Sequence, residues 1–155
     1  MSNWTHVAAI FRVDSFSHEG KDFTKIFGKE LDYYDSTEKW NEASDHPEHF
    51  LPLGSEGSLQ MSIWENPDKS CMNVFTISVF GDLRDHDSIE EIIKWFDEKC
   101  SQLWIRQAVI TVENEWNGTQ TKTYGDTEDY ITQILCHLVQ EVRENPNATI
   151  NYLEY

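Results

Sequence analysis

The chain has few basic residues. Its 155 residues include 12 Lys and Arg against 28 Asp and Glu, which gives a formal net charge of −16 at pH 7. Phosphate backbones and anionic membrane surfaces are repelled by such a field, so we expect no direct binding to nucleic acid or to a membrane. A basic protein surface is instead attracted, with fast and salt-sensitive association. A charge of this size also keeps proteins soluble, and alone it identifies no partner.

Long hydrophobic runs and paired cysteines are also missing. No apolar run approaches the roughly 18–20 residues of a membrane span, and residues 1–6 lack the basic and apolar regions of a signal peptide. The three cysteines, Cys71, Cys100 and Cys136, are widely spaced and form no CxxC pair. We therefore expect a cytoplasmic protein with reduced thiols.

The common catalytic motifs are absent from the sequence. It contains no GxSxG, P-loop, GxGxxG or HExxH pattern. The two glycines of the stretch 54–58 are followed by neither a helix nor a lysine, so a phosphate cradle is unsupported. We predict no catalytic residue and no cofactor, and the sequence favours a non-enzymatic protein.

Aromatic residues, in contrast, make up 13% of the chain. Disordered chains lack such content, so we expect one folded domain spanning residues 1–155. Alternating apolar residues predict strands, apolar residues at helical spacing predict helices, and Asn117-Gly118 predicts a two-residue hairpin turn because both residues tolerate positive φ. The predicted strands are 4–14, 58–64, 71–80, 104–116, 119–124 and 148–155, and the predicted helices are 21–34, 88–102 and about 126–145.

Two helix starts have their own signals. Asp22 is placed to cap the first helix, and Ser88 with Glu91 three residues later forms the capping-box pattern. Residues 35–57 show no period and contain two prolines and two glycines, so we expect a long loop there with a short turn of helix near Trp40.

The order of these elements predicts an α+β fold. We expect a single domain with a mainly antiparallel sheet and helices on one face. Its first six elements match a split βαβ (ferredoxin-like) core, which a C-terminal hairpin, a helix and an edge strand then follow.

Two clusters have residue types that bind metals. Asp82, Asp85, His86 and Asp87 lie together, but without the central glycine of a calcium loop, and carboxylates before a helix already interact favourably with its dipole. The second cluster surrounds a His pair three residues apart, interrupted by a proline. We predict no metal, and both clusters remain the basis of an alternative. The members of the second cluster are Asp45, His46, Glu48 and His49.

The stretch from Glu30 to Glu48 is strongly acidic. It holds seven carboxylates and a single lysine, with aromatic residues among them. Carboxylates on a rigid frame can occupy a cleft lined with Lys and Arg, and aromatic residues can anchor such a contact. Together with the aspartates before the second helix, this stretch supplies the predicted partner-binding residues, which are Glu30, Asp32, Tyr34, Asp35, Glu38, Trp40, Glu42, Asp82, Asp85 and Asp87.

Three stretches, WTHVAAIFRVDS at 4–15, GSEGSLQMSIWENPD at 54–68 and FTISVFGDLRD at 75–85, resemble small uncharacterised proteins encoded by phages and prophages. The resemblance brings no catalytic residue. It implies a setting in which small acidic proteins block a host defence nuclease or another host factor.

The preferred hypothesis is therefore a non-enzymatic, acidic interaction protein. It would be an anti-defence (anti-CRISPR-like) inhibitor that mimics nucleic acid and binds the basic surface of a host nuclease or another nucleic-acid-binding protein. Three alternatives stay open: a toxin-immunity-type inhibitor, a metal-dependent or small-ligand enzyme using either the cluster from Asp82 to Asp87 or the His46/His49 loop, and a structural homo-oligomer.

Overall fold

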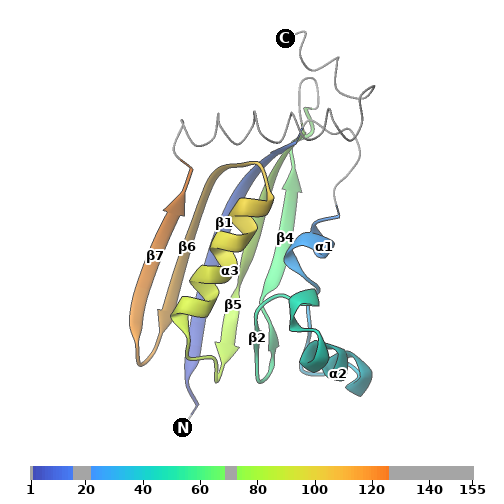
Figure 1. The fold of residues 1–155 in the computed structure, drawn as a ribbon, viewed down its shortest axis with the longest axis vertical. Coiled ribbons are helices and arrows are strands. Elements are labelled where there is room, and N and C mark those ends of the chain that lie inside the picture. Colours follow the sequence, from blue (N-terminus) through green and yellow to red (C-terminus); the bar gives the residue numbers. More distant parts are fainter. Residues whose placement is uncertain (1, 16–21, 69–72, 126–155) are drawn as a thin grey trace.

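The computed structural model describes residues 2–15, 22–68 and 73–125. These residues form one α+β domain with a five-stranded antiparallel sheet and three helices (Figure 1). The predicted C-terminal helix (about 126–145) and edge strand (148–155) lie outside the described residues. The elements are β1 (Trp4–Ser15), α1 (Phe23–Phe27), α2 (Thr37–Asp45), the 3-10 helix η1 (Pro47–His49), β2 (Leu53–Gly54), β3 (Gly57–Ser58), β4 (Gln60–Glu65), β5 (Asn73–Arg84), α3 (Ile89–Gln102), β6 (Ile105–Asn114) and β7 (Gly118–Tyr124).

The sheet has the strand order β4-β5-β1-β6-β7, with β1 in the centre. β1 pairs antiparallel with β5 along its whole length and with β6 on its other side. The predicted alternation is confirmed, because Val7, Ala9, Phe11 and Val13 are all buried. The face that these residues share is covered by α3 and α1, and the main hydrophobic core lies between them and the sheet (Figure 1).

Helix α3 agrees with its prediction. Ser88 is its N-cap, and the Ser88 hydroxyl accepts a hydrogen bond of 3.2 Å from the Glu91 backbone N–H. The Glu91 carboxylate lies 3.6 Å from His86 Nε2. The apolar stripe of the helix is buried and consists of Ile89, Ile92, Ile93, Phe96 and Cys100.

The first helix is much shorter than predicted. Asp22 caps α1 as expected, but the helix ends at Phe27 rather than continuing to residue 34. Gly28 has a φ of 114°, and a Cβ at this position would lie 2.3 Å from the carbonyl carbon of Phe50. The chain turns at Gly28 because its backbone packs directly against residue 50, and only glycine leaves room for that contact.

The segment 35–57 is more regular than predicted. The expected turn of helix near Trp40 is a full helix, α2, capped by Ser36, whose hydroxyl accepts from the Lys39 N–H at 3.3 Å. After η1 comes a small hairpin of β2 and β3. A second, small hydrophobic cluster holds this part together. It contains buried Leu31, Ala43 and Phe50, with Trp40 and Leu53 packed against them.

Both predicted hairpins are present, with one difference. β4 pairs with β5 and β6 pairs with β7, each antiparallel. The predicted two-residue Asn117-Gly118 turn is wrong, because Gly118 is already paired with Asn114 and, within the described residues, Asp85 alone among non-glycines has positive φ. The Asn114 side-chain oxygen accepts hydrogen bonds of 2.9 Å from the N–H groups of Trp116 and Asn117, and so closes a three-residue turn.

Candidate functional site

The acidic stretch begins as an extended ribbon after Gly28. The Lys29 N–H donates to the His49 carbonyl at 2.8 Å, and the Leu51 N–H donates to the Lys29 carbonyl at 2.9 Å. On the other side, the Leu31 N–H donates to the Ser58 hydroxyl at 2.8 Å. Hydrogen bonds therefore hold this extended segment in place along both of its edges.

In this extended segment, alternate side chains point to opposite sides of the backbone. Successive side chains of an extended chain point to opposite sides. Leu31 is only 3% exposed and enters the small cluster, while its neighbours Glu30 and Asp32 are exposed. The Asp32 carbonyl also accepts a hydrogen bond of 3.1 Å from Trp40 Nε1, which ties the ribbon to α2. Two carboxylates are thus held outward on a rigid support.

A hollow of about 420 Å³ opens beside this ribbon, and we call it the acidic groove. Five carboxylates from three separate parts of the chain line it, and Lys39 is the one basic residue among its described lining residues. The carboxylates are Glu30, Asp32, Asp35, Glu56 and Asp82, and the remaining lining residues are Trp4, Leu31, Lys39, Gly57, Ser58 and Gln60.

Asp35 is held in its ionised form. Its carboxylate accepts a hydrogen bond of 2.7 Å from the Asp32 backbone N–H, and Lys39 Nζ lies 3.4 Å away. The backbone hydrogen bond, with a smaller contribution from Lys39, lowers the pKa of Asp35 below its ordinary value. The single lysine of the groove is therefore already paired with a carboxylate.

Two other groove carboxylates are anchored to the sheet. The Glu30 carboxylate accepts a hydrogen bond of 2.7 Å from the Met61 N–H on β4. Asp82 on β5 lies 2.6 Å from His6 Nδ1 on β1. That hydrogen bond with Asp82 is the main reason why the pKa of His6 is raised above its ordinary value.

A set of polar contacts joins Glu56, which lines the groove, to the end of β5. Arg84 forms an ion pair with Glu56. The neighbouring Asp85, with a φ of 59°, accepts hydrogen bonds from the Ser55 hydroxyl at 3.0 Å and from the Asn3 N–H at 3.5 Å. Asp85 therefore fastens the turn between β2 and β3 to the end of β5. It is a predicted binding residue that the structure places in a supporting position.

Other predicted residues lie outside the groove. Trp40 is half-buried in the small cluster, and Glu42 lies 3.3 Å from Lys29 Nζ. Glu38 is exposed in the first turn of α2, and Tyr34 is 89% exposed. Of these, Tyr34 is the aromatic side chain that is accessible to a partner.

Asp87 is also outside the groove, just before α3. The Asp87 backbone carbonyl accepts a hydrogen bond of 3.0 Å from the Asn117 side-chain amide. Asp87 is exposed. The structure therefore brings together Glu30, Asp32 and Asp35 from the acidic stretch with Asp82, one of the predicted aspartates before α3. It leaves Asp87 apart.

The carboxylate of Glu56 and the aromatic side chain of Trp4 line the groove and were not predicted as binding residues. Glu56 lies in a glycine-rich turn and Trp4 opens β1, so neither belongs to a run of like charges. Their only signal in the sequence is residue type. Their position depends on the pairing of β1 with β5 and on the β2–β3 hairpin, which places residue 56 against Arg84.

The metal-binding alternatives receive no support from the described residues. Within ranges 2–15, 22–68 and 73–125, no group of three or more His, Cys, Asp or Glu side chains converges as metal ligands would. His46 and His49 stack with ring centroids 5.2 Å apart, and His46 Nδ1 lies 3.4 Å from Glu48. In the other cluster, Asp85 is engaged by Ser55.

Comparisons with protein-family models, with curated proteins and with solved structures return no match for this chain. In the part of the chain that the structure describes, no helix is both long enough and apolar enough to cross a membrane.

Proposed function

We propose that the protein is a non-enzymatic inhibitor whose acidic groove binds a basic, nucleic-acid-handling surface of a host protein, as an anti-defence (anti-CRISPR-like) protein. The observation that carries the proposal is the meeting of five carboxylates from separate parts of the chain in one hollow. Lys39, the one basic residue among the described lining residues, is paired with Asp35. Among the described residues, Asp35, Glu56 and Asp82 are paired with Lys39, Arg84 and His6. A cationic side chain of a partner therefore meets Glu30 and Asp32 without a competing positive charge from the groove.

The rigidity of the groove supports the same proposal. Glu30, Asp35 and Asp82 each make a short hydrogen bond that holds the carboxylate in place before any partner arrives. Such preorganisation reduces the entropy lost on binding. Duplex nucleic acid presents one negative charge per about 1.7 Å of its axis, so a fixed array of carboxylates can occupy a Lys- and Arg-lined cleft in its place.

The groove also offers apolar contact. Trp4 lines it and is only half-buried, and Tyr34 stands exposed beyond Asp32. Aromatic side chains at such positions provide desolvated contact area and can lie against an Arg guanidinium. Charge would then set the rate of association, and the aromatic residues would contribute to the lifetime of the complex.

Neutral substitutions in the groove test the proposal. The triple variant Glu30→Gln, Asp32→Asn, Asp82→Asn removes three charges and keeps hydrogen-bonding side chains. The matched control, Glu90→Gln, Glu98→Gln, Glu113→Gln, removes three charges from exposed positions outside the groove. Both variants have the same net charge. A difference in their affinity for a partner therefore depends on where the charges were removed and not on the total charge.

The measurement has two steps. The wild-type protein is immobilised, basic proteins of a bacterial lysate are captured at low salt, and affinity for each identified partner is then measured for both variants. We expect the groove variant to lose at least about tenfold in affinity and the control to lose little. We also expect binding to weaken steeply between 0.1 and 1 M salt, where the Debye length falls from about 10 to 3 Å. Equal affinity of the two variants, or binding that salt does not weaken, would refute the proposal.

The proposed nucleic-acid mimicry is tested separately, by measuring whether a captured partner still binds nucleic acid. A captured partner should lose its binding to duplex or guide nucleic acid when the wild-type protein is added, and should retain it with the groove variant. Simultaneous binding of nucleic acid and this protein to the partner would show that the groove does not occupy the nucleic-acid site.

We also propose that the sheet is an elaborated split βαβ (ferredoxin-like) core. The order β4-β5-β1-β6 and the placement of helices between β1 and β4 and between β5 and β6 support this assignment. α1, at five residues, is shorter than the helix that such a core normally has, and α2 with its small cluster occupies the rest of the connection.

A further inference from the structure

The face of the sheet opposite α3 carries exposed apolar side chains. Ile10 on β1 is 49% exposed, and its register partner Val109 on β6 is 38% exposed. Phe80 on β5 and Trp64 on β4, both 43% exposed or more, lie on the same face. Single apolar side chains on a surface are ordinary, but four on neighbouring strands of one face indicate a surface that something covers.

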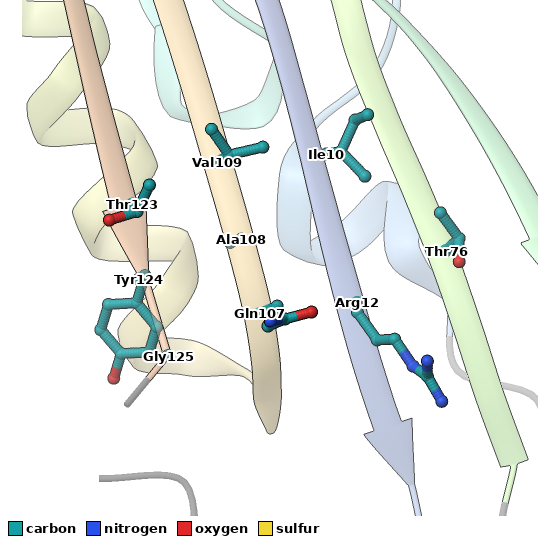
Figure 2. Close-up of a pocket in the computed structure, with 9 residues that line it drawn as sticks. All are labelled: Ile10, Arg12, Thr76, Gln107, Ala108, Val109, Thr123, Tyr124 and Gly125. Atoms are coloured by element: carbon teal, nitrogen blue, oxygen red, sulfur yellow. The ribbon is translucent and has the colours of Figure 1, made fainter. Parts of the chain in front are cut away.

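One end of this face is hollowed. The hollow has a volume of about 890 Å³, and Figure 2 shows Ile10, Val109, Arg12 and Gln107 on the side of the sheet that faces away from the helices. Arg12 is the one charged residue among its described lining residues, and within the described residues its buried Nε has no hydrogen-bond partner. The full lining is Ile10, Arg12, Thr76, Gln107, Ala108, Val109, Thr123, Tyr124 and Gly125.

The chain leaves the described structure from the rim of this hollow. Tyr124 ends β7, and Gly125 is both a lining residue and the last described residue. Gly125 has a φ of 109°, and a Cβ there would lie 2.4 Å from the Arg106 carbonyl oxygen. The point where the chain continues beyond Gly125 is therefore at the rim of the hollow.

The sequence of the segment that follows Gly125 suits an apolar hollow with one positive charge. Its first residues include Asp126, Glu128 and Asp129, opposite in sign to Arg12. A helix over 127–145 would be about 28 Å long, which spans a five-stranded sheet with strands about 4.8 Å apart. Its apolar stripe at helical spacing is Ile131, Ile134, Leu135, Leu138 and Val142.

We propose that residues 126–145 dock as an amphipathic helix on the open face of the sheet, with their apolar stripe in the hollow. The other face is already covered by α3 and α1. A segment tethered at Gly125 has an effective concentration on the order of millimolar at the hollow, well above the concentration at which a second copy of the chain would compete. The intramolecular helix is therefore the occupant.

This docking site is separate from the acidic groove. β1 contributes Trp4 to the groove and Arg12 to the hollow, and eight residues of strand separate the two positions by about 26 Å. Failure of the groove variants would leave the docking proposal untouched, and the reverse holds as well.

Thiol labelling of the full-length chain tests the docking. Cys71 and Cys136 are replaced by Ser, and a single cysteine is introduced as Leu138→Cys or, in the matched control, Gln140→Cys. On a helix these positions point about 200° apart, so one belongs to the stripe and the other to the opposite side. Cys100 is retained as an internal reference, because burial raises the pKa of its thiol to about 12 and it reacts only when the protein unfolds.

We expect iodoacetamide to label the cysteine at position 138 at least about tenfold more slowly than the one at 140. Adding Val109→Glu should bring the two rates together, because it places a carboxylate in the hollow. Thr111→Glu, two residues along the same strand and outside the lining, should leave the protection intact.

Other results would overturn the proposal. Equal labelling at 138 and 140 would show that the stripe is not covered. Protection that survives Val109→Glu would place the segment elsewhere. Protection that rises with protein concentration, together with a dimer by light scattering, would make a second copy the occupant.

Discussion

The described part of the chain contains two hydrophobic clusters of very different size. Among the described residues, the main cluster has 22 buried members and joins the sheet to α1 and α3. The small cluster has three, Leu31, Ala43 and Phe50, with two half-buried neighbours. The first is built from regular elements with buried stripes, whereas the second is held largely by backbone hydrogen bonds between residues 29–31 and their neighbours.

Because of this difference, the two clusters have different roles: the main cluster stabilises the domain, and the small cluster holds the groove residues in position. Apolar burial stabilises a fold roughly in proportion to the area removed from water, so the main cluster dominates the stability of the domain. The small cluster buries little, yet it holds the ribbon that carries Glu30 and Asp32 outward. The groove should therefore be weakened by changes that leave the sheet folded.

The largest effect is expected in the main cluster. Phe96→Ala removes a side chain that is fully buried, with its ring centroid 5.3 Å from that of Phe11. We expect a loss of about 3–5 kcal/mol in the free energy of unfolding, measured by chemical denaturation, because lost transfer energy and a cavity add. Tyr34→Ala, at a position 89% exposed, serves as the control and should change stability by less than about 0.5 kcal/mol. Similar losses in both variants would contradict the comparison.

A smaller and more local effect is expected in the small cluster. Leu31→Ala should cost about 2 kcal/mol, at the low end for a buried leucine, because this cluster can relax toward solvent. Amide hydrogen exchange should quicken across residues 29–58 and stay slow in β1 and β6. A uniform increase over the whole sheet would show that the two clusters unfold as one unit.

The two serine caps allow a matched comparison. Ser88 caps α3 on the main cluster and Ser36 caps α2 on the small one, with acceptor distances of 3.2 and 3.3 Å. Each Ser→Ala change should cost about 1 kcal/mol, and Ser→Thr should restore most of it. Ser88→Ala should lower the denaturation midpoint of the whole domain, whereas Ser36→Ala should appear chiefly as faster exchange in residues 37–45. Equal shifts of the denaturation midpoint in the two Ser→Ala variants would contradict the expected difference between the two clusters.

The smallest effect concerns the pair between His6 and Asp82, which lies in neither cluster. The hydrogen bond to Asp82 raises the pKa of His6 above 6.5. A raised folded-state pKa stabilises the fold below the unfolded pKa of 6.5, and this contribution is lost as the pH rises through the folded value. An NMR titration should show the His6 pKa falling toward 6.5 in Asp82→Asn. An unchanged pKa in that variant would mean that another group sets it.

Much of the sheet could be predicted from local patterns. The alternation in β1 and the stripe with the Ser88 cap in α3 are set by side chains close in sequence, and both are confirmed. The end of α1 could not be predicted, because Gly28 stops the helix through its contact with Phe50, which is distant in sequence. The hairpin turn after β6 failed for a similar reason, since Asn114 rather than Asn117-Gly118 closes it.

Several residues of the candidate site could be predicted from the sequence, but the fact that they line one groove could not. Glu30, Asp32 and Asp35 stand out in an acidic run, and Asp82 in a second one. Glu56 and Trp4 do not stand out, and nothing in the sequence shows that these residues share one hollow. Trp40 looked like a contact residue, yet it packs into the small cluster and donates to the Asp32 carbonyl.

The amino-acid sequence by itself determined the strongly negative charge, the α+β class and the positions of the longest strands and of α3, because each follows from composition or from a short repeating pattern. Only the tertiary structure decided that carboxylates from residues 30–35, 56 and 82 line the same groove and that one face of the sheet is left uncovered by the described helices. Both depend on strand pairing and close backbone contacts between residues far apart in the chain, and such contacts leave no periodic signal in a single sequence.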